Sequence, residues 1–63
     1  MTKQYAISYL HYVLATRDTY EAAQEYAKEA ESDRDVRNDK SQRGLIGPIS
    51  DYITIYDATG EDL

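Results

Sequence analysis

The chain carries few residue types that could perform catalysis, and none of them lies in a spacing that a reaction requires. His11 is the only histidine, it has no serine or cysteine nucleophile in its context, and cysteine is absent from the sequence. Carboxylates are so abundant that a pair such as Asp51 and Asp57 does not indicate general acid–base chemistry. We therefore predict no catalytic residues and no enzymatic activity, with His11 as a partly buried structural side chain.

Two short motifs resemble ligand-binding loops without meeting their requirements. The run from Asp33 to Asp39 alternates acidic residues as a calcium loop does. However, Arg37 occupies the third ligand position, and Asn38 stands where that loop needs glycine. The glycines of RGLIGP (residues 43–48) lack the Lys-Ser/Thr ending of a phosphate-binding loop. The sequence thus predicts neither a metal site nor a bound cofactor.

Tyrosine is the residue type that points to molecular contact. The chain has seven tyrosines and no Phe or Trp. Tyrosine buries a large amphipathic area at a low cost in side-chain entropy, and it is enriched at protein interfaces. Unless the helix or the first segment covers the outward face of the last strand, that face is a contact strip. The predicted protein-interface residues are Tyr9, Tyr12, Tyr52, Thr54 and Tyr56.

An acidic row and a basic cluster are two further candidate surfaces. Acidic residues recur every four positions, about 6 Å apart on a helix, so the row could imitate phosphates; a solvated helix face is the alternative, which the intervening Lys28 favours. The basic cluster is interleaved with aspartates and has no aromatic residue to stack on bases, so a solvated loop is favoured over RNA contact. The acidic face comprises Glu21, Glu25 and Glu29, and the basic loop comprises Arg34, Arg37, Lys40 and Arg43.

The elements that position these residues begin with the segment from Lys3 to Ala15. Its tyrosine, isoleucine and valine residues favour a strand, and both alternating faces are partly apolar, as in a central strand covered on two sides. A helix is the competing interpretation, because Ala6, Leu10 and Leu14 also share helical spacing. The segment could also fold back as a hairpin, or another chain could complete the sheet.

The second segment predicts a helix from Thr19 to Glu31. Asp18 stands at the N-cap position with Glu21 three residues later, which resembles a capping box. Alanine, glutamate and lysine are strong helix formers. The stripe predicted to face the core consists of Ala22, Ala23, Tyr26, Ala27 and Ala30.

The rest of the chain predicts a polar loop and a final strand. Residues 32–47 show no apolar periodicity, so we expect a loop, with the helix extending into it by a turn or two as the alternative. Residues 49–58 alternate as a half-buried strand with Ile49, Ile53 and Ile55 inward, and residues 57–60 form a turn. A parallel crossover is the default, and an antiparallel pairing is equally permitted.

The expected fold is therefore a small single α+β domain over residues 1–63. Its order is strand, helix, polar loop, strand, with the helix packed on one face of a small sheet. The alternative is a mainly α-helical hairpin with a C-terminal strand. A chain of this length has a thin core and marginal stability, so we expect it to gain stability from a partner chain.

Charge narrows the expected partners. Twelve acidic residues against seven basic ones give a net charge of −5, which disfavours nucleic acids and anionic membranes and suits a basic protein surface. No signal peptide is visible and the longest apolar stretch is too short to span a bilayer, so we expect the cytoplasm or a host cytoplasm. We expect an acidic protein-interaction module, such as a virus-encoded or mobile-element-encoded inhibitor or adaptor of a larger host protein. The alternative is a structural homo-oligomer assembling through the tyrosine-rich strand, and a nucleic-acid mimic or binder is less favoured.

Overall fold

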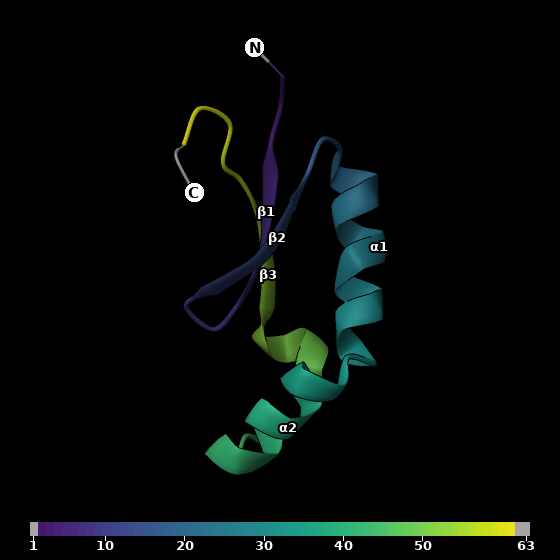
Figure 1. The fold of residues 1–63 in the computed structure, drawn as a ribbon, viewed down its shortest axis with the longest axis vertical. Helices are drawn as coiled ribbons and strands as arrows, with labels where there is room; N and C mark the ends of the chain where they lie inside the picture. Colours follow the sequence, from purple (N-terminus) through teal and green to yellow (C-terminus); the bar gives the residue numbers. More distant parts are fainter. Residues whose placement is uncertain (1, 62–63) are drawn as a thin grey trace.

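A three-stranded antiparallel sheet, two α-helices and a short 3-10 helix make up the fold in the computed structural model, which describes residues 2–61 (Figure 1). The strands lie in the order β2-β1-β3, and α1 runs along one side of the sheet. The predicted α+β class, with a helix on one face of a small sheet, is confirmed. The elements are β1 (Tyr5–Tyr9), β2 (Tyr12–Arg17), α1 (Tyr20–Glu31), α2 (Arg34–Arg43), η1 (Ile49–Tyr52) and β3 (Ile53–Asp57).

The N-terminal segment is a hairpin rather than one long strand. β1 and β2 pair antiparallel on either side of a tight turn at Leu10 and His11, and Leu10 has a positive φ of 56°. The register shifts in the middle of the pair, because Ile7 faces Ala15 whereas Ser8 faces Val13. The extra residue between Val13 and Ala15 is a β-bulge, which increases the local twist of β2.

Helix α1 agrees closely with the prediction. Ala23 and Ala30 are buried, while the predicted polar face is exposed to solvent. The N-cap is Thr19 rather than Asp18, because the Thr19 hydroxyl accepts a hydrogen bond from the Ala22 N–H at 3.1 Å. Small alanine side chains let the helix approach the sheet closely.

The predicted polar loop is wrong over most of its length, because residues 34–43 form helix α2. Asp33 caps its first turn by accepting hydrogen bonds from the N–H groups of Asp35 and Val36. Gly44 ends the helix in the left-handed conformation, with φ 69°. Val36 is the single buried residue of α2, so the helix touches the core at one point only.

The final strand is shorter than predicted and runs antiparallel to β1. Residues 49–52 form η1, and β3 then pairs with β1 so that Ile55 faces Ile7. The predicted turn after the strand is present, because the Asp57 carboxylate accepts a hydrogen bond from the Thr59 N–H at 2.9 Å.

The core lies between the sheet, α1, α2 and η1. Tyr9, Val36 and Ile49 form a buried cluster, and Ile7 is fully buried on the central strand. Across residues 2–61, no helix is long and apolar enough to cross a membrane.

Candidate functional site

Strand β3 lies at the edge of the sheet, and two hydrogen bonds outside the regular ladder fix which way its backbone groups point. The Leu10 N–H donates to the Tyr52 carbonyl at 3.1 Å just before β3, and the Ala58 N–H donates to the Gln4 carbonyl at 2.8 Å just after it. In an antiparallel pair, residues alternate between those that exchange hydrogen bonds with the neighbour and those that do not. Even-numbered residues of this segment therefore turn their backbone towards β1.

The odd-numbered residues of β3 consequently turn their backbone groups outwards, away from β1. Thr54 and Tyr56 pair with β1, whereas Ile53, Ile55 and Asp57 form the outer edge. The Ile53 N–H is already occupied by the Ser50 carbonyl at the end of η1. Within the described chain, no strand pairs with the outward groups of Ile55 and Asp57. These groups form an unpaired backbone edge, which is a template for another strand.

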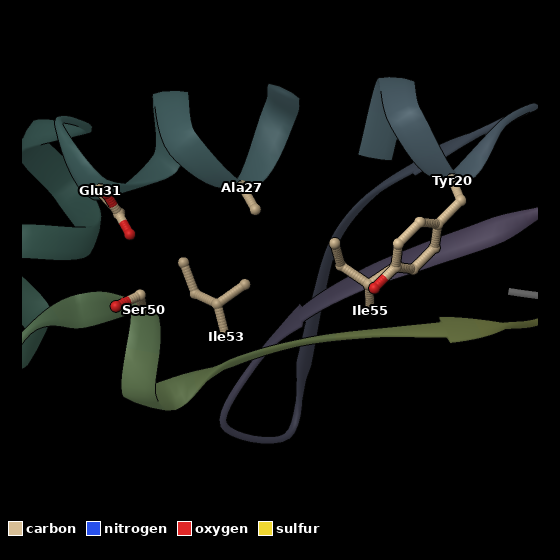
Figure 2. Close-up of a pocket in the computed structure, with 6 residues that line it drawn as sticks. All are labelled: Tyr20, Ala27, Glu31, Ser50, Ile53 and Ile55. Carbon is tan, nitrogen blue, oxygen red and sulfur yellow. The ribbon is translucent and has the colours of Figure 1, made fainter. Parts of the chain in front are cut away.

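A groove between this edge and α1 lies beside the unpaired groups, and we call it the β3 groove. Its volume is about 190 Å³. Figure 2 shows the Ile53 and Ile55 side chains rising from β3 towards the helix, with Ala27 and Tyr20 above them. Both isoleucines are only half-buried, so the groove floor is apolar and accessible. The β3 groove is lined by Tyr20, Ala27, Glu31, Ser50, Ile53 and Ile55.

The groove owes its shape to the residues of α1 on its β3 side. Ala27 lies opposite Ile53 and is too small to fill the space that a larger side chain would occupy. At the far end, the Tyr20 ring meets the Tyr5 ring edge-on with centroids 5.8 Å apart, while Tyr20 remains 49% exposed. The tyrosine therefore forms one wall of the groove and still offers an amphipathic face to a ligand.

Carboxylates mark both ends of the β3 edge. Glu31 lines the groove at the η1 end, and Asp57 closes the opposite end of the strand. The pKa of Asp57 is lowered, mainly because the Thr59 hydroxyl and N–H both donate hydrogen bonds to its carboxylate, and to a smaller extent by Lys3. Asp57 is therefore ionised at neutral pH. None of the residues that line the groove is basic.

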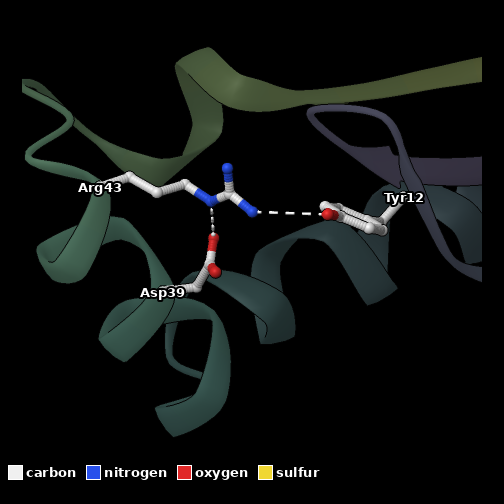
Figure 3. Close-up of polar contacts among 3 residues, drawn as sticks. All are labelled: Tyr12, Asp39 and Arg43. Atoms are coloured by element: carbon white, nitrogen blue, oxygen red, sulfur yellow. Dashed lines mark hydrogen bonds and ion pairs between the residues drawn. The ribbon is translucent and has the colours of Figure 1, made fainter.

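A second polar cluster joins α2 to the β1–β2 hairpin (Figure 3). Arg43 donates from Nε to Asp39 at 2.7 Å, and its guanidinium reaches the Tyr12 hydroxyl at 3.5 Å and lies 5.8 Å from the Tyr12 ring centroid. Figure 3 shows Arg43 lying between the other two side chains. The hydrogen bond from Arg43 is the main cause that lowers the pKa of Asp39. This cluster faces solvent and connects α2 to β2, so we assign it a structural role in holding α2 against the hairpin.

Tyr9 lies beside this cluster, with its hydroxyl buried. Burial is the larger cause that raises the pKa of Tyr9, and Asp39 raises it further. Asp39 therefore lies close to the Tyr9 hydroxyl. Within residues 2–61, however, this hydroxyl makes no hydrogen bond of normal geometry. The buried phenol thus favours its neutral form.

The predicted tyrosine strip does not form as a single face. Tyr9 is 3% exposed and belongs to the core. Tyr52 lies in η1 and packs against that core, and its hydroxyl donates a hydrogen bond to the Ile46 carbonyl. Thr54 and Tyr56 do lie on the sheet face opposite α1, and Tyr56 is 36% exposed. Tyr12 is exposed at the hairpin, next to Arg43.

The two predicted charged surfaces lie on the two α-helices. The acidic row lies on the solvent face of α1 and does not line the β3 groove. The basic residues lie on a helix rather than a loop: Arg43 is paired with Asp39, and Arg37 and Lys40 line a shallow polar cleft against residues 44–49. The acidic row is Glu21, Glu25 and Glu29, and Arg34 begins α2.

The residues considered for chemistry or metal binding are also dispersed. His11 is exposed in the hairpin turn, which corrects the expectation of partial burial. Asp33 and Asp35 belong to the first turn of α2, where Asp33 is a helix cap. Over residues 2–61, no three His, Asp or Glu side chains gather in a way that could hold a metal ion.

Comparison with protein-family models, curated proteins and solved structures found no match to this chain. The function is therefore inferred from the geometry of the β3 edge and its groove.

Proposed function

We propose that this protein is an interaction module that binds an extended segment of another protein as an added strand along β3. The observation that carries the proposal is the unpaired outer edge of β3 beside an accessible apolar groove. In strand addition, main-chain hydrogen bonds provide affinity and pockets for alternate side chains provide specificity. Ile55 supplies both parts here, since its backbone faces outwards and its side chain forms the groove floor.

The other edge of the sheet is less suited to this role. The bulge in β2 between Val13 and Ala15 interrupts the regular spacing of its outward groups. Bulges of this kind twist an edge away from incoming strands. β3 has a continuous register with β1 from Tyr5 opposite Asp57 to Tyr9 opposite Ile53, and it contains neither proline nor lysine. The two edges therefore differ in the features that block pairing.

The dimensions of the edge indicate a short linear ligand. β3 has five residues, which corresponds to about 17 Å of extended chain. A contact along so short a strand buries less surface than the roughly 1,200 Å² of a stable protein–protein interface. We therefore expect transient binding of a peptide-like segment, in which affinity comes from backbone pairing and one or two apolar side chains.

Selection from a displayed library of random short peptides tests the proposal directly. The two variants Ile55→Pro and Ile55→Ala form the decisive pair, because both lose the groove side chain but only proline loses the outward N–H. Proline is tolerated on an edge strand when its nitrogen faces solvent, so the ladder to β1 stays intact. We expect the selected peptides to bind Ile55→Ala weakly and Ile55→Pro not at all.

A control on the opposite face separates strand addition from contact through the tyrosine face. Tyr56→Ser removes the exposed ring from the side of the sheet away from α1, without altering the outward groups of β3. The selected peptides should bind this variant as they bind the parent protein. Peptides that bind Ile55→Pro as tightly as Ile55→Ala, or that are lost in Tyr56→Ser alone, would overturn the proposed edge contact.

A further inference from the structure

We infer that the segment bound at the β3 groove is basic at both ends and apolar between them: two apolar side chains face Ile53 and Ile55, and a lysine or arginine faces each of Glu31 and Asp57. This inference rests on the proposed strand addition and specifies its partner. It excludes the β3 edge of a second copy of this chain as the occupant. Three features of the groove lead to it.

The first feature is the alternation of the edge. Ile53, Ile55 and Asp57 share one side of β3, the side that faces α1. An added strand keeps the same pleat, so the residues opposite these three also point towards α1. The two opposite the isoleucines enter the space between Tyr20 and Ala27, where apolar side chains are favoured. The ligand positions in question are therefore two residues apart.

The second feature is the charge at the two ends. The ligand residue opposite Asp57 stands directly across from an ionised carboxylate. At the other end, the ligand residue two positions beyond the one that faces Ile53 approaches Glu31. Opposite charges across a strand pair are stabilising, and like charges directly opposite are destabilising. The chain as a whole carries a net charge of −5, so longer-range attraction also favours a basic segment.

The third feature concerns a second copy of the protein. Antiparallel pairing of two β3 edges about a two-fold axis at Ile55 would place Ile53 opposite Asp57 of the second copy. That carboxylate would then approach Glu31, and the symmetry would repeat the conflict at the other end. Because the β3 edge has an acid at both ends, the β3 edge of a second copy cannot supply the basic groups that the groove selects.

The resulting pattern is basic-x-apolar-x-apolar-x-basic, where x faces away from α1. It reads the same in both chain directions, so parallel and antiparallel addition satisfy it equally. The peptide Lys-Thr-Ile-Thr-Val-Thr-Lys, with blocked termini, represents it. Matched peptides replace both lysines with threonine or with glutamate. A fourth, Lys-Ile-Thr-Val-Thr-Thr-Lys, has the same composition but cannot place its apolar and basic groups on the α1 side together.

Titration of the ¹⁵N-labelled full chain with each peptide, followed by NMR shifts of β3 amides, is the test. We expect the Lys-flanked peptide to bind about fivefold more tightly than the Thr-flanked one, from two exposed charge pairs. The Glu-flanked peptide should bind more weakly than both, and the register-shifted peptide should lose the lysine advantage. Raised salt should remove that advantage and leave the Thr-flanked peptide unchanged. Glu31→Gln should weaken the Lys-flanked peptide alone.

The outcomes separate the two proposals. Equal affinity of the Lys-, Thr- and Glu-flanked peptides, with binding still abolished in Ile55→Pro, would overturn the basic pattern and leave strand addition standing. If none of the four peptides binds and the library selection yields no edge-dependent peptide, both strand addition and the basic pattern are overturned. A concentration-dependent dimer in sedimentation that disappears in Ile55→Pro would identify a second copy as the occupant and overturn the inference.

Discussion

Replacing Ile7 with alanine should remove a large share of the stability of this fold. Ile7 is the largest fully buried side chain, with 0% exposure, and it lies on the central strand between Ala15 of β2 and Ile55 of β3. Truncating a buried isoleucine to alanine costs about 2–5 kcal/mol. A chain of 63 residues has roughly 3–9 kcal/mol in total, at about 0.05–0.15 kcal/mol per residue. We expect Ile7→Ala to lose about half of the stability and Ile7→Val to lose about 1 kcal/mol.

Urea denaturation followed by circular dichroism measures this loss, because the midpoint shifts with stability while the slope reports the surface exposed on unfolding. Val13→Ala is the matched control. Val13 lies on the same hairpin but is 41% exposed on the uncovered face, so its truncation should cost less than about 0.5 kcal/mol. The reasoning is refuted if the parent protein folds cooperatively and Ile7→Ala shifts the free energy of unfolding no more than Val13→Ala does.

Four further predictions concern the helix caps and the titrating groups. Thr19→Ala should lower the free energy of unfolding by about 1 kcal/mol, whereas Asp18→Ala should leave it unchanged in the same urea assay, because Thr19 caps α1. Gly44→Ala should cost about 1 kcal/mol, because Gly44 ends α2 at a left-handed φ of 69° and an added Cβ would meet no other atom, so the cost is that of the backbone conformation. The melting temperature should fall below about pH 4, because Arg43 lowers the pKa of Asp39 and the stability this provides is present above the unfolded pKa and lost as pH falls. Asp39→Asn should reduce that acid loss. The melting temperature should also fall above about pH 10, because burial raises the pKa of Tyr9 and its stability is lost as pH rises. Tyr9→Phe should show a smaller alkaline loss in a pH series of thermal melts.

Helix α1 could be predicted from the sequence because local signals agreed with one another. Its alanine stripe, polar face and helix-forming composition all indicated the same element, and the structure places its start one residue after the predicted one. The sequence left the hairpin as one of several possibilities for residues 3–15, because its turn at Leu10 and His11 has none of the Gly, Asn or Pro residues that mark turns. Helix α2 was missed because only Val36 faces the core, so no apolar periodicity exists. Asp33 and Gly44, its caps, were the available signals.

The candidate site depended on information that no local pattern contains. The alternation of residues 49–58 correctly indicated that Ile53 and Ile55 face the packed side of a strand. It did not indicate that this strand is an edge, since that depends on the insertion of β1 between β2 and β3. Nor did it indicate that Ala27 would leave the isoleucines half-exposed. The same alternation placed Tyr52 with Tyr56, but the chain turns through η1 there and carries Tyr52 into the core region.

Hydrogen exchange of the Ile55 amide tests the central claim most directly. In the free protein the Tyr56 amide is paired with β1 and the Ile55 amide faces outwards, so Ile55 should exchange fast and Tyr56 slowly. Saturation with the Lys-Thr-Ile-Thr-Val-Thr-Lys peptide should slow the exchange of Ile55 and leave that of Tyr56 nearly unchanged. An Ile55 amide that is already protected in the free protein, or that still exchanges fast when the peptide is bound, would contradict strand addition at β3.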